Sequence, residues 1–355
     1  MKIIKYLFFI LLIVTIGGAL YFGTQDGTYD LTESKTINAP TSLVFEKVNE
    51  LRNWKQWGPW KEQDPNMIFT YPENTAGAGG SYSWEGNTIG TVRTISSSPN
   101  SEIIQEFSIE TSRGIRNMNV KWNFVETHNG TQVSWQMGGE HTLLDKVYFW
   151  MNSTDFNNNI KQMQLAGLDG ISNTVIDDMA SYNIEVTGIS EHGGGYYLYV
   201  TTASQASQLT QKMAEMFGQI THYMGQHNIR PSGMPFTIYH QTDAVTGSMV
   251  LSAGMPVNEL IDVVEGSNVA CGFMERTSAV KTILKGNYQN LPEAYEKAEA
   301  YITRNHLIKN PDRQIFEIYA NDPGEYPNPA DWLTEIYIPV FNDLRSNHPI
   351  ITESK

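Results

Sequence analysis

Cysteine and positive charge are both scarce in this sequence. Cys271 is the single cysteine in 355 residues, so an intramolecular disulfide is excluded, and its apolar neighbours favour a buried, unreactive thiol. The chain has 24 Lys and Arg against 38 Asp and Glu, which gives a formal charge of −14. A chain of this charge repels phosphate backbones, and it has no basic stripe, zinc-finger spacing or helix-turn-helix pattern. We therefore expect no nucleic-acid partner.

Several motifs of catalytic and cofactor sites are also missing. The sequence contains neither Gly-x-Ser-x-Gly nor a Walker A loop. His222 and His227 are five residues apart, whereas a helical metal pair needs three or four, and the other histidines form no metal-binding spacing either. We expect no cofactor and no metal ion.

Charge is absent from one long segment near the N-terminus. Tyr6 to Gly23 is uncharged and rich in Leu, Ile and Phe, which is long enough to cross a bilayer as a helix. Lys2 and Lys5 precede it and acidic residues follow, so the positive-inside rule places the N-terminus in the cytoplasm and the bulk of the chain outside. We predict a single-pass transmembrane signal anchor at residues 1–23 in the cell membrane. A cleaved signal peptide is the alternative.

Residues 33–179, which follow a polar linker at 24–32, have the pattern of one domain. A strand at 34–37 and a helix capped by Thr41 or Ser42 open it, and an amphipathic helix over 153–179 closes it. Alternating segments between them predict strands at 67–71, 80–85, 89–95, 102–109, 117–126 and 131–139. This order predicts an antiparallel sheet curled around the last helix.

The start of this domain carries a motif: Ala39-Pro40, Val44-Phe45, Trp54, Trp57 and Trp60. Together with the strand order, it resembles the START-like polyketide cyclase (SRPBCC) superfamily. The resemblance implies a helix-grip fold with an apolar cavity between sheet and helix, in which members bind lipids or other hydrophobic molecules and some are enzymes. We find no catalytic set of that family here. The three tryptophans step by three residues, as in a helical turn, and we interpret them as packing residues.

The second domain, residues 182–349, contains the same sequence motif twice. Its two versions are about 80 residues apart: Phe236-Thr-Ile-Tyr239 with Gly254-Met-Pro-Val257, and Phe316-Glu-Ile-Tyr319 with Tyr337-Ile-Pro-Val340. Each follows a helical stretch, so we predict a strand-helix-strand-strand unit built twice and packed as a pseudo-symmetric pair. Counting back from the prolines places Glu335 at the position of Ser252. A carboxylate that only one version carries is a candidate for function.

The second version carries further motifs: Gly286-Asn-Tyr288-Gln-Asn-Leu291-Pro-Glu-Ala294-Tyr295, Phe316 to Asp322, and Trp332-Leu-Thr-Glu335-Ile-Tyr-Ile-Pro339-Val340. These resemble the GyrI-like effector-binding family, which includes a gyrase-inhibitory protein and the ligand-sensing halves of some bacterial transcription activators. The resemblance implies two modules that form one sheet, with a ligand groove at their seam. It also implies that a glutamate at the position of Glu335 contacts the ligand, which is often a cationic aromatic molecule.

Glu335 is therefore the main candidate for a ligand contact. Strand alternation puts Glu335 and Tyr337 on one face, and the isoleucines between and after them on the other, helix-covered face. A carboxylate ringed by aromatic faces attracts an organic cation. The alternative is an exposed strand residue on a solvated face. The full set of predicted ligand-binding residues is Glu335, Tyr337, Glu317, Tyr319, Tyr239, Tyr288 and Trp332.

These observations predict an α+β protein: a helix-grip domain, a duplicated GyrI-like domain and one N-terminal membrane helix. We expect a membrane-anchored small-molecule-binding protein that holds a hydrophobic or cationic aromatic ligand around Glu335. One alternative is a hydrolase of electrophilic small molecules, with Glu335 as general base and Tyr337 or Tyr319 orienting the substrate. Another is a scaffold protein whose two pockets are filled by side chains.

Overall fold

The computed structural model describes residues 2–60, 64–111, 113–243 and 246–341. Its contacts divide the chain into unit 1, Met1–Asp178, and unit 2, Met179–Lys355, and each is described by itself. The predicted end of the second domain, residue 349, lies outside the described residues.

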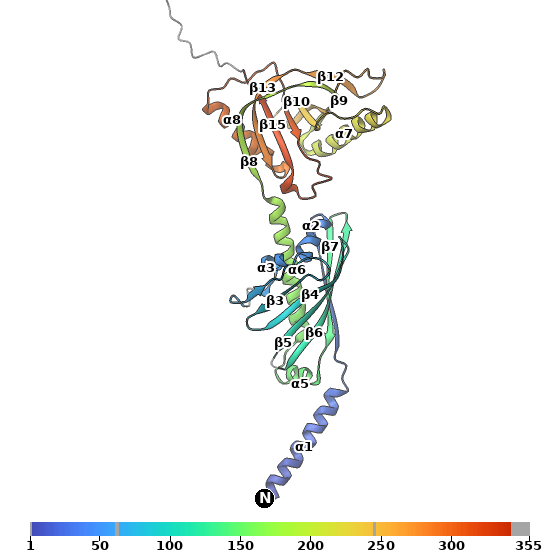
Figure 1. The fold of residues 1–355 in the computed structure, drawn as a ribbon, viewed down its shortest axis with the longest axis vertical. Helices are drawn as coiled ribbons and strands as arrows, with labels where there is room; N and C mark the ends of the chain where they lie inside the picture. The colour runs from blue at the N-terminus through green and yellow to red at the C-terminus, as the bar shows by residue number, and fades with distance from the viewer. Residues whose placement is uncertain (1, 61–63, 112, 244–245, 342–355) are drawn as a thin grey trace, which may run out of the picture. The chain divides into compact units, whose positions relative to one another are not determined.

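Unit 1 begins with the apolar helix α1 and continues as a seven-stranded antiparallel sheet with helices beside it (Figure 1). The sheet order is β1-β7-β6-β5-β4-β3-β2, so neighbouring strands follow the chain except at β1, which pairs with β7. The elements are α1 (Lys2–Gly23), β1 (Thr28–Ile37), α2 (Thr41–Asn49), η1 (Leu51–Asn53), α3 (Trp54–Trp57), β2 (Ile68–Thr70), β3 (Ser81–Glu85), β4 (Ile89–Ser98), β5 (Glu102–Thr111), β6 (Gly114–Thr127), β7 (Gly130–Glu140), α5 (Leu143–Met151) and α6 (Phe156–Ala180).

Strand β1 is longer than the strand predicted at 34–37. It begins at Thr28, inside the segment that we predicted to be a linker, and pairs with β7 from Thr28 opposite Glu140 to Ile37 opposite Thr131. Alternate residues of β1 are exposed, so polar side chains suit one of its faces. The polar composition of residues 28–33 concealed the strand, because only one face needs apolar side chains.

Tryptophan side chains fill the space between the sheet and α6. Trp54, Trp122 and Trp135 are fully buried and Trp57 is nearly so. The rings of Trp122 and Trp135 stack with centroids 4.4 Å apart, and Trp122 donates a hydrogen bond to the buried Gln105 at 3.0 Å. The resemblance to the START-like superfamily implies a cavity at this place, whereas these rings occupy it as packing residues.

Two glycines let α6 closely approach the Trp135 ring and the backbone at Trp57. A Cβ on Gly167 would lie 2.6 Å from Cζ3 of Trp135, and one on Gly170 would lie 2.2 Å from the carbonyl oxygen of Trp57. Gln164, also fully buried, donates to the carbonyl oxygens of Trp135 and Leu31 at 2.8 and 3.1 Å. This face of the helix is therefore matched to the sheet by small and polar residues as well as apolar ones.

The region before α6 differs from the prediction of a single helix over 153–179. Residues 143–151 form a separate helix, α5, which we did not predict, and α6 starts only at Phe156. Thr142 and Asp145 form a capping box that starts α5, and Ser153 has a φ of 49°. This left-handed residue breaks the helical path between α5 and α6.

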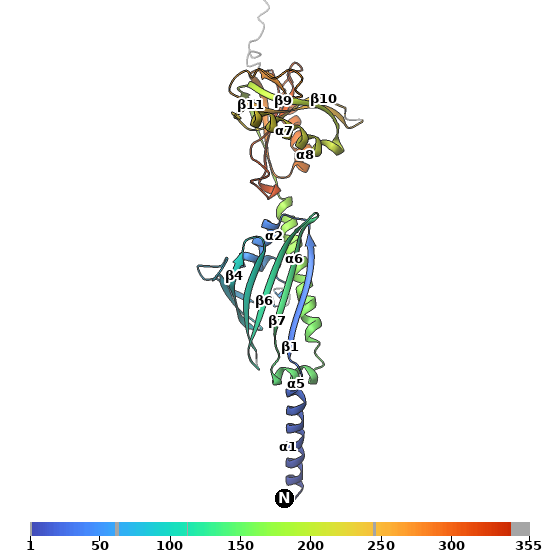
Figure 2. The same ribbon diagram turned by 90° about the vertical axis from the view of Figure 1, so that its right-hand side faces the viewer.

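Over its described residues, unit 2 is an eight-stranded antiparallel sheet with two α-helices (Figures 1 and 2). The sheet order is β12-β9-β11-β10-β14-β15-β13-β8. The elements are β8 (Asn183–His192), β9 (Gly195–Gln205), η2 (Ala206–Gln208), α7 (Leu209–Gln226), β10 (Phe236–Thr242), β11 (Ser248–Val257), β12 (Ala270–Met274), β13 (Thr277–Lys285), η3 (Tyr288–Asn290), α8 (Leu291–Arg304), β14 (Ile315–Tyr319), η4 (Pro329–Asp331) and β15 (Leu333–Pro339).

The two modules, β9-α7-β10-β11 and β13-α8-β14-β15, meet at the centre of the sheet. There β10 pairs with β14, with Phe236 opposite Ile318 and Ile238 opposite Phe316. Residues about 80 positions apart thus exchange places across the seam, and Thr237 lies opposite its own equivalent, Glu317. A pseudo-two-fold axis passes through this pair. The register also makes Ser252 and Glu335 equivalent, because they lie opposite Ile238 and Ile318.

The two helices cover the same type of surface in each module. Helix α7 packs on a core that includes Leu198 and Leu251, and α8 packs on one that includes Val280, Ile336 and Ile338. The isoleucines of β15 thus face a helix, as the alternation predicted. Edge strand β12 was not predicted, and its Cys271 is only partly buried rather than enclosed.

Candidate functional site

Glu317 lies at the centre of the sheet of unit 2, on the face that the helices cover. On β14, it lies opposite Ile336 of β15, which packs in the core beneath α8, and opposite Thr237 of β10, the other neighbouring strand. Cross-strand partners share a face, so Glu317 and Thr237 point toward the helix layer between the two modules. Glu317 is only 1% exposed and Thr237 is fully buried.

Three tyrosine hydroxyl groups donate hydrogen bonds to the Glu317 carboxylate. Tyr295 of α8 donates to Oε1 at 2.7 Å, and Tyr239 of β10 donates to Oε2 at 3.1 Å. Tyr319, two residues along the strand, also lies 3.1 Å from Oε2 and at the same distance from Thr237 Oγ1. Among the described residues, the contacts of this carboxylate are hydroxyl groups, and no cationic side chain pairs with it.

Further aromatic rings surround this tyrosine cluster. Tyr288 makes an edge contact with Tyr319, with centroids 5.7 Å apart, and its ring lies 4.8 Å from that of Trp332. Phe217 of α7 makes an edge contact with Tyr319 at 6.1 Å. We call the set Glu317, Thr237, Tyr239, Tyr295, Tyr319, Tyr288, Trp332 and Phe217 the glutamate box. Both modules contribute to it.

Burial sets the protonation of the glutamate box. It raises the pKa of Glu317, and the hydrogen bonds from the three tyrosines offset only part of that rise. Burial and the neighbouring carboxylate raise the pKa of Tyr239, Tyr295 and Tyr319, and that of Tyr288 to about 12. The phenols therefore stay protonated donors, and Glu317 is the acidic group of the box, with a pKa raised above its usual value.

Glu335 and Tyr337 lie on the opposite face of the same sheet. Lys281 Nζ lies 2.7 Å from Glu335 Oε1, and the Tyr337 hydroxyl donates to Oε2 at 2.7 Å. The ring of Tyr337 stacks on Phe316 with centroids 4.7 Å apart. Each oxygen of Glu335 thus has a partner from the protein itself, and its charge is matched by Lys281.

The predicted site residues therefore fall into two groups. Five of them lie together in the glutamate box: Glu317, Tyr319, Tyr239, Tyr288 and Trp332. Glu335 and Tyr337 lie away from it, on the other face of the sheet. Alternation predicted the helix-covered face of β15, but not that β14 pairs with β15 so that Glu317 lies on that face. Sequence reasoning missed Lys281, and it named Tyr295 only as part of a family motif and not as a site residue. A tyrosine inside an otherwise apolar helix stripe was the available signal for Tyr295.

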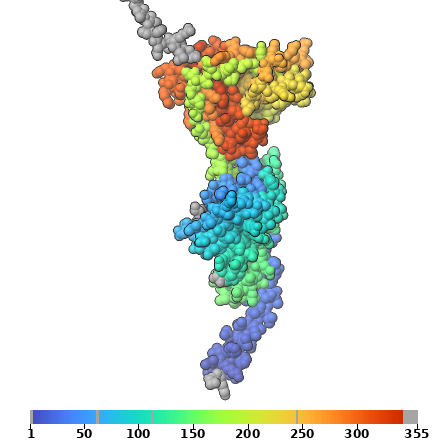
Figure 3. All heavy atoms as spheres, in the orientation of Figure 1, coloured from blue at the N-terminus to red at the C-terminus, as the bar shows by residue number. Residues whose placement is uncertain are grey.

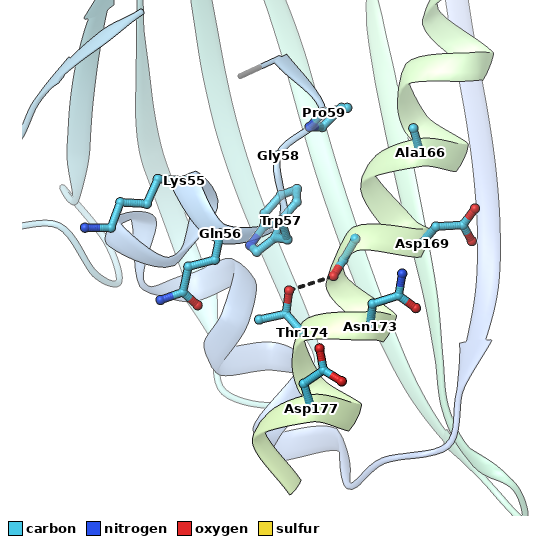
Figure 4. Close-up of a pocket in the computed structure, with 11 residues that line it drawn as sticks. Lys55, Gln56, Trp57, Gly58, Pro59, Ala166, Asp169, Asn173, Thr174 and Asp177 are labelled. Atoms are coloured by element: carbon cyan, nitrogen blue, oxygen red, sulfur yellow. Dashed lines mark hydrogen bonds between the residues drawn. The ribbon is translucent and has the colours of Figure 1, made fainter. Parts of the chain in front are cut away.

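Unit 1 has a hollow of about 620 Å³ between α6 and the segment around α3 (Figure 4). Its lining is Lys55, Gln56, Trp57, Gly58, Pro59, Ala166, Asp169, Gly170, Asn173, Thr174 and Asp177. Asp169 pairs with Lys35 at 2.5 Å with 62% of its side chain exposed, and Thr174 donates to the carbonyl oxygen of Gly170 at 2.8 Å. Its charges are solvated, so the glutamate box is the stronger candidate site.

Residues 196–340 match the family model described as the GyrI-like small molecule binding domain. The chain is similar to the solved C-terminal domain of EcmrR, with 19% identity over 45% of this chain and 98% of that one and a TM-score of 0.39. The EcmrR–DNA complex, determined by cryo-EM, has 18% identity over 56% of this chain and 77% of that one, also with a TM-score of 0.39. A protein from Chromobacterium violaceum has 13% identity over 41% of this chain and 95% of that one, with a TM-score of 0.32.

No curated protein sequence matches the chain significantly. Over residues 196–340, the family match supports the GyrI-like small-molecule-binding domain that we predicted at residues 182–349. The START-like resemblance of unit 1 and the absence of a nucleic-acid partner stay predictions.

Proposed function

We propose that unit 2 binds an organic cation whose positive charge pairs with Glu317 and whose apolar groups contact the rings of the glutamate box. One observation carries the proposal: a fully buried carboxylate receives three tyrosine hydrogen bonds but, within the described residues, no countercharge. The family match supports a small-molecule ligand, and the chemistry of the box supports its charge.

The energetic argument rests on the cost of burying charge. An ionised carboxylate removed from water loses several kcal/mol of solvation unless an opposite charge accompanies it. A bound cation would supply this charge, and aromatic faces add about 0.5–2 kcal/mol each when the cation is desolvated. A soft, weakly hydrated cation, such as an aromatic quaternary ammonium ion, loses less solvation on entry than a primary ammonium ion.

Entry requires the aromatic cover of the box to move. Glu317 is 1% exposed, and Tyr288 and Trp332 contact each other next to Tyr319. The indole of Trp332 is held by a 2.8 Å hydrogen bond to the carbonyl oxygen of Tyr326. Ligand binding should therefore change the environment of Trp332.

The chain offers a matched control for the experiment. Glu317→Gln and Glu335→Gln remove the same charge from the two faces of one sheet. Phenyltrimethylammonium and its neutral isostere tert-butylbenzene differ only in charge. We expect the full-length protein to bind the cation in preference to the isostere, by calorimetry and by tryptophan fluorescence. We expect Glu317→Gln to weaken cation binding at least about tenfold, or ~1.4 kcal/mol, and Glu335→Gln to leave it unchanged.

The reverse pattern, with cation binding lost in Glu335→Gln and kept in Glu317→Gln, would move the site to the other face. Equal affinity for the cation and its neutral isostere would show that Glu317 does not pair with the charge of the ligand. The contribution of Trp332 can be read separately, because Trp332→Phe should remove the fluorescence change and keep the binding heat.

The hydrolase alternative has less support. It requires Glu335 as a general base, whereas one Glu335 oxygen pairs with Lys281 and the other accepts the hydrogen bond of Tyr337. A base that activates water needs a free oxygen facing the substrate.

We further propose that α1 is a membrane span and that both units lie outside the cytoplasm. Among the described residues, Ile3–Gly23 is the one helix long and apolar enough to cross a bilayer, with a mean hydropathy of 2.4. A chain carrying C-terminal alkaline phosphatase should be active and resist carbonate extraction from bacterial membranes. An inactive alkaline phosphatase fusion, together with fluorescence from a C-terminal green fluorescent protein fusion, would place both units in the cytoplasm and contradict the proposed orientation.

A further inference from the structure

Helix α5 presents large apolar side chains to solvent although its other face is firmly fixed. Leu144, Trp150 and Met151 are 61%, 69% and 70% exposed. A monomeric soluble domain rarely collects such side chains on one short helix unless something covers them.

The fixed face of α5 is anchored by Asp145, which is buried. Its carboxylate completes the capping box with Thr142 and accepts hydrogen bonds from Arg113 Nε at 2.9 Å and Arg116 Nε at 2.5 Å. On the same side, Phe149 packs against His141 and Phe156, with centroids 5.1 and 5.4 Å apart. The orientation of α5 on unit 1 is thus determined, and so is the exposure of its outer face.

The same helix contacts the end of α1. Lys146 Nζ donates to the carbonyl oxygen of Phe22 at 3.4 Å, in the last turn of α1 where carbonyls lack helical partners, and to that of Gln25, two residues past the helix, at 2.5 Å. The Trp150 ring makes an edge contact with Phe22, with centroids 5.8 Å apart. Within unit 1, α5 therefore lies beside the last turn of the apolar helix, whose side chains are uncovered (Figure 3).

We propose that the outer face of α5 lies in the interfacial layer of the lipid bilayer that α1 enters, so that unit 1 is attached to the membrane at two points. The proposal rests on the proposed membrane span at α1. If the last turn of α1 is at the bilayer surface, the helix in contact with that turn is at the same level. Tryptophan and tyrosine are the residues that prefer this layer, and α5 carries Trp150 and Tyr148.

The neighbouring basic groups suit the same location. Lys146 lies at the end of α1, and the Arg113 guanidinium stacks 3.9 Å from the centre of the Tyr148 ring. Short amphipathic helices with aromatic and aliphatic side chains on one side and basic groups nearby lie flat in the headgroup region. A bilayer accounts for the exposed apolar face with no further component, because the proposed span already brings it there.

The test uses single-cysteine variants of the full-length chain in a Cys271→Ser background, reconstituted in phosphatidylcholine–phosphatidylglycerol vesicles. An environment-sensitive fluorophore is attached at Met151→Cys on α5, at Ile13→Cys within α1, or at Val125→Cys. Val125 is also exposed, but it lies nine residues beyond Arg116 on β6, roughly 30 Å along the strand. All three positions are exposed side chains, so the substitutions leave the folded core intact.

We expect the fluorophore at position 151 to emit at shorter wavelength than that at 125, and a headgroup-attached spin label to quench it at least about twofold more. A water-like signal at 151, together with quenching of position 13 by a deep acyl-chain spin label, would overturn the interfacial role and leave the span intact. Loss of lipid quenching at both 13 and 151 would overturn both. Shielding of 151 from aqueous iodide without lipid quenching would indicate a protein partner or a second copy, and would also refute the proposal.

Discussion

Glu317 shows how a buried carboxylate can be held by hydroxyl groups, with no ion pair within the part of the chain that the structure describes. Three phenols donate to it, and each keeps its proton because burial and the carboxylate itself raise the phenol pKa. Burial nevertheless raises the pKa of Glu317 above its usual value. Ionisation of Glu317 therefore costs part of the stability of the free protein, and the proposed cationic ligand would supply the opposite charge.

This arrangement predicts a stabilising substitution. A carboxyl group whose pKa is raised by folding contributes stability that is fully present below its unfolded pKa and lost as pH rises through its folded pKa. Glu317→Gln should therefore raise the melting temperature of the unliganded protein at pH 8, and the gain should shrink toward pH 5. Differential scanning calorimetry across this range measures it, with Glu335→Gln as the control. A gain that grows on acidification would contradict the assignment.

Cation binding should depend on pH for the same reason. The raised pKa means that part of Glu317 is protonated when the pH approaches its folded pKa from above, and a cation binds the ionised form. Affinity should rise with pH and then level off, and binding should release protons. Calorimetry in two buffers of different ionisation enthalpy detects the release, which Glu317→Gln should abolish.

The tyrosines of the glutamate box should contribute differently to the free energy of unfolding. Among the described residues, Tyr295 is the one donor to Oε1 of Glu317, whereas Oε2 has two donors. Tyr295→Phe therefore removes the hydrogen bond to one buried oxygen. We expect a loss of about 1–3 kcal/mol in the free energy of unfolding at pH 8. Tyr288→Phe removes a hydroxyl group from the same box that is not among the donors to Glu317, and should cost less. Equal losses in urea denaturation would show that Tyr295 acts only through packing.

At the scale of elements, the contact of α6 with the tryptophan layer determines the interior of unit 1. Gly167 permits that contact, because a Cβ there would lie 2.6 Å from the Trp135 ring. In α7, Gly218 has nothing within 4 Å of the equivalent position. Replacing either glycine by alanine gains the same intrinsic helix propensity. The difference between the two stability changes therefore measures the cost of the clash at Gly167.

Gly167→Ala should therefore lower stability by roughly 1–3 kcal/mol through overpacking. Gly218→Ala should raise it by up to about 1 kcal/mol. Thermal melts of the full-length variants test both, and near-ultraviolet circular dichroism should show disturbed tryptophan signals for Gly167→Ala alone. A neutral Gly167→Ala would mean that the Trp135 ring can move aside.

Most strands and helices were predictable, because alternation and helical spacing follow directly from burial. The exceptions have physical reasons. Residues 28–33 look like a linker because one face of β1 is solvated, and α5 escaped notice because its apolar side chains do not face a core. The sequence also could not decide between Glu317 and Glu335, because the choice depends on the register of β14 against β15, which places Glu317 opposite Ile336 on the helix-covered face.

At the scale of the whole molecule, duplication explains why the box has a single acid. Thr237 and Glu317 are equivalent positions that lie opposite each other on the pseudo-two-fold axis. If both modules carried glutamate there, two buried carboxylates would be neighbours, and one would have to hold a proton. The second version of the repeat could acquire its charge only because the first kept a small, neutral side chain.

Thr237→Glu tests this symmetry argument. We expect it to be less stable than Thr237→Gln, which has similar size without the charge, by about 3–5 kcal/mol at pH 8. The difference should decrease as the pH falls and the carboxylates become protonated. Chemical denaturation at several pH values measures it, and a difference independent of pH would exclude charge repulsion as the cause.

The cover over Glu317 has one further consequence. Because its carboxylate is 1% exposed beneath packed rings, the rate at which an occupant arrives or departs is limited by how often those rings open, whatever its affinity. A compound trapped there would dissociate slowly compared with one at an open surface. The proposed site would therefore suit slow release of its ligand better than a rapid response to changes in ligand concentration.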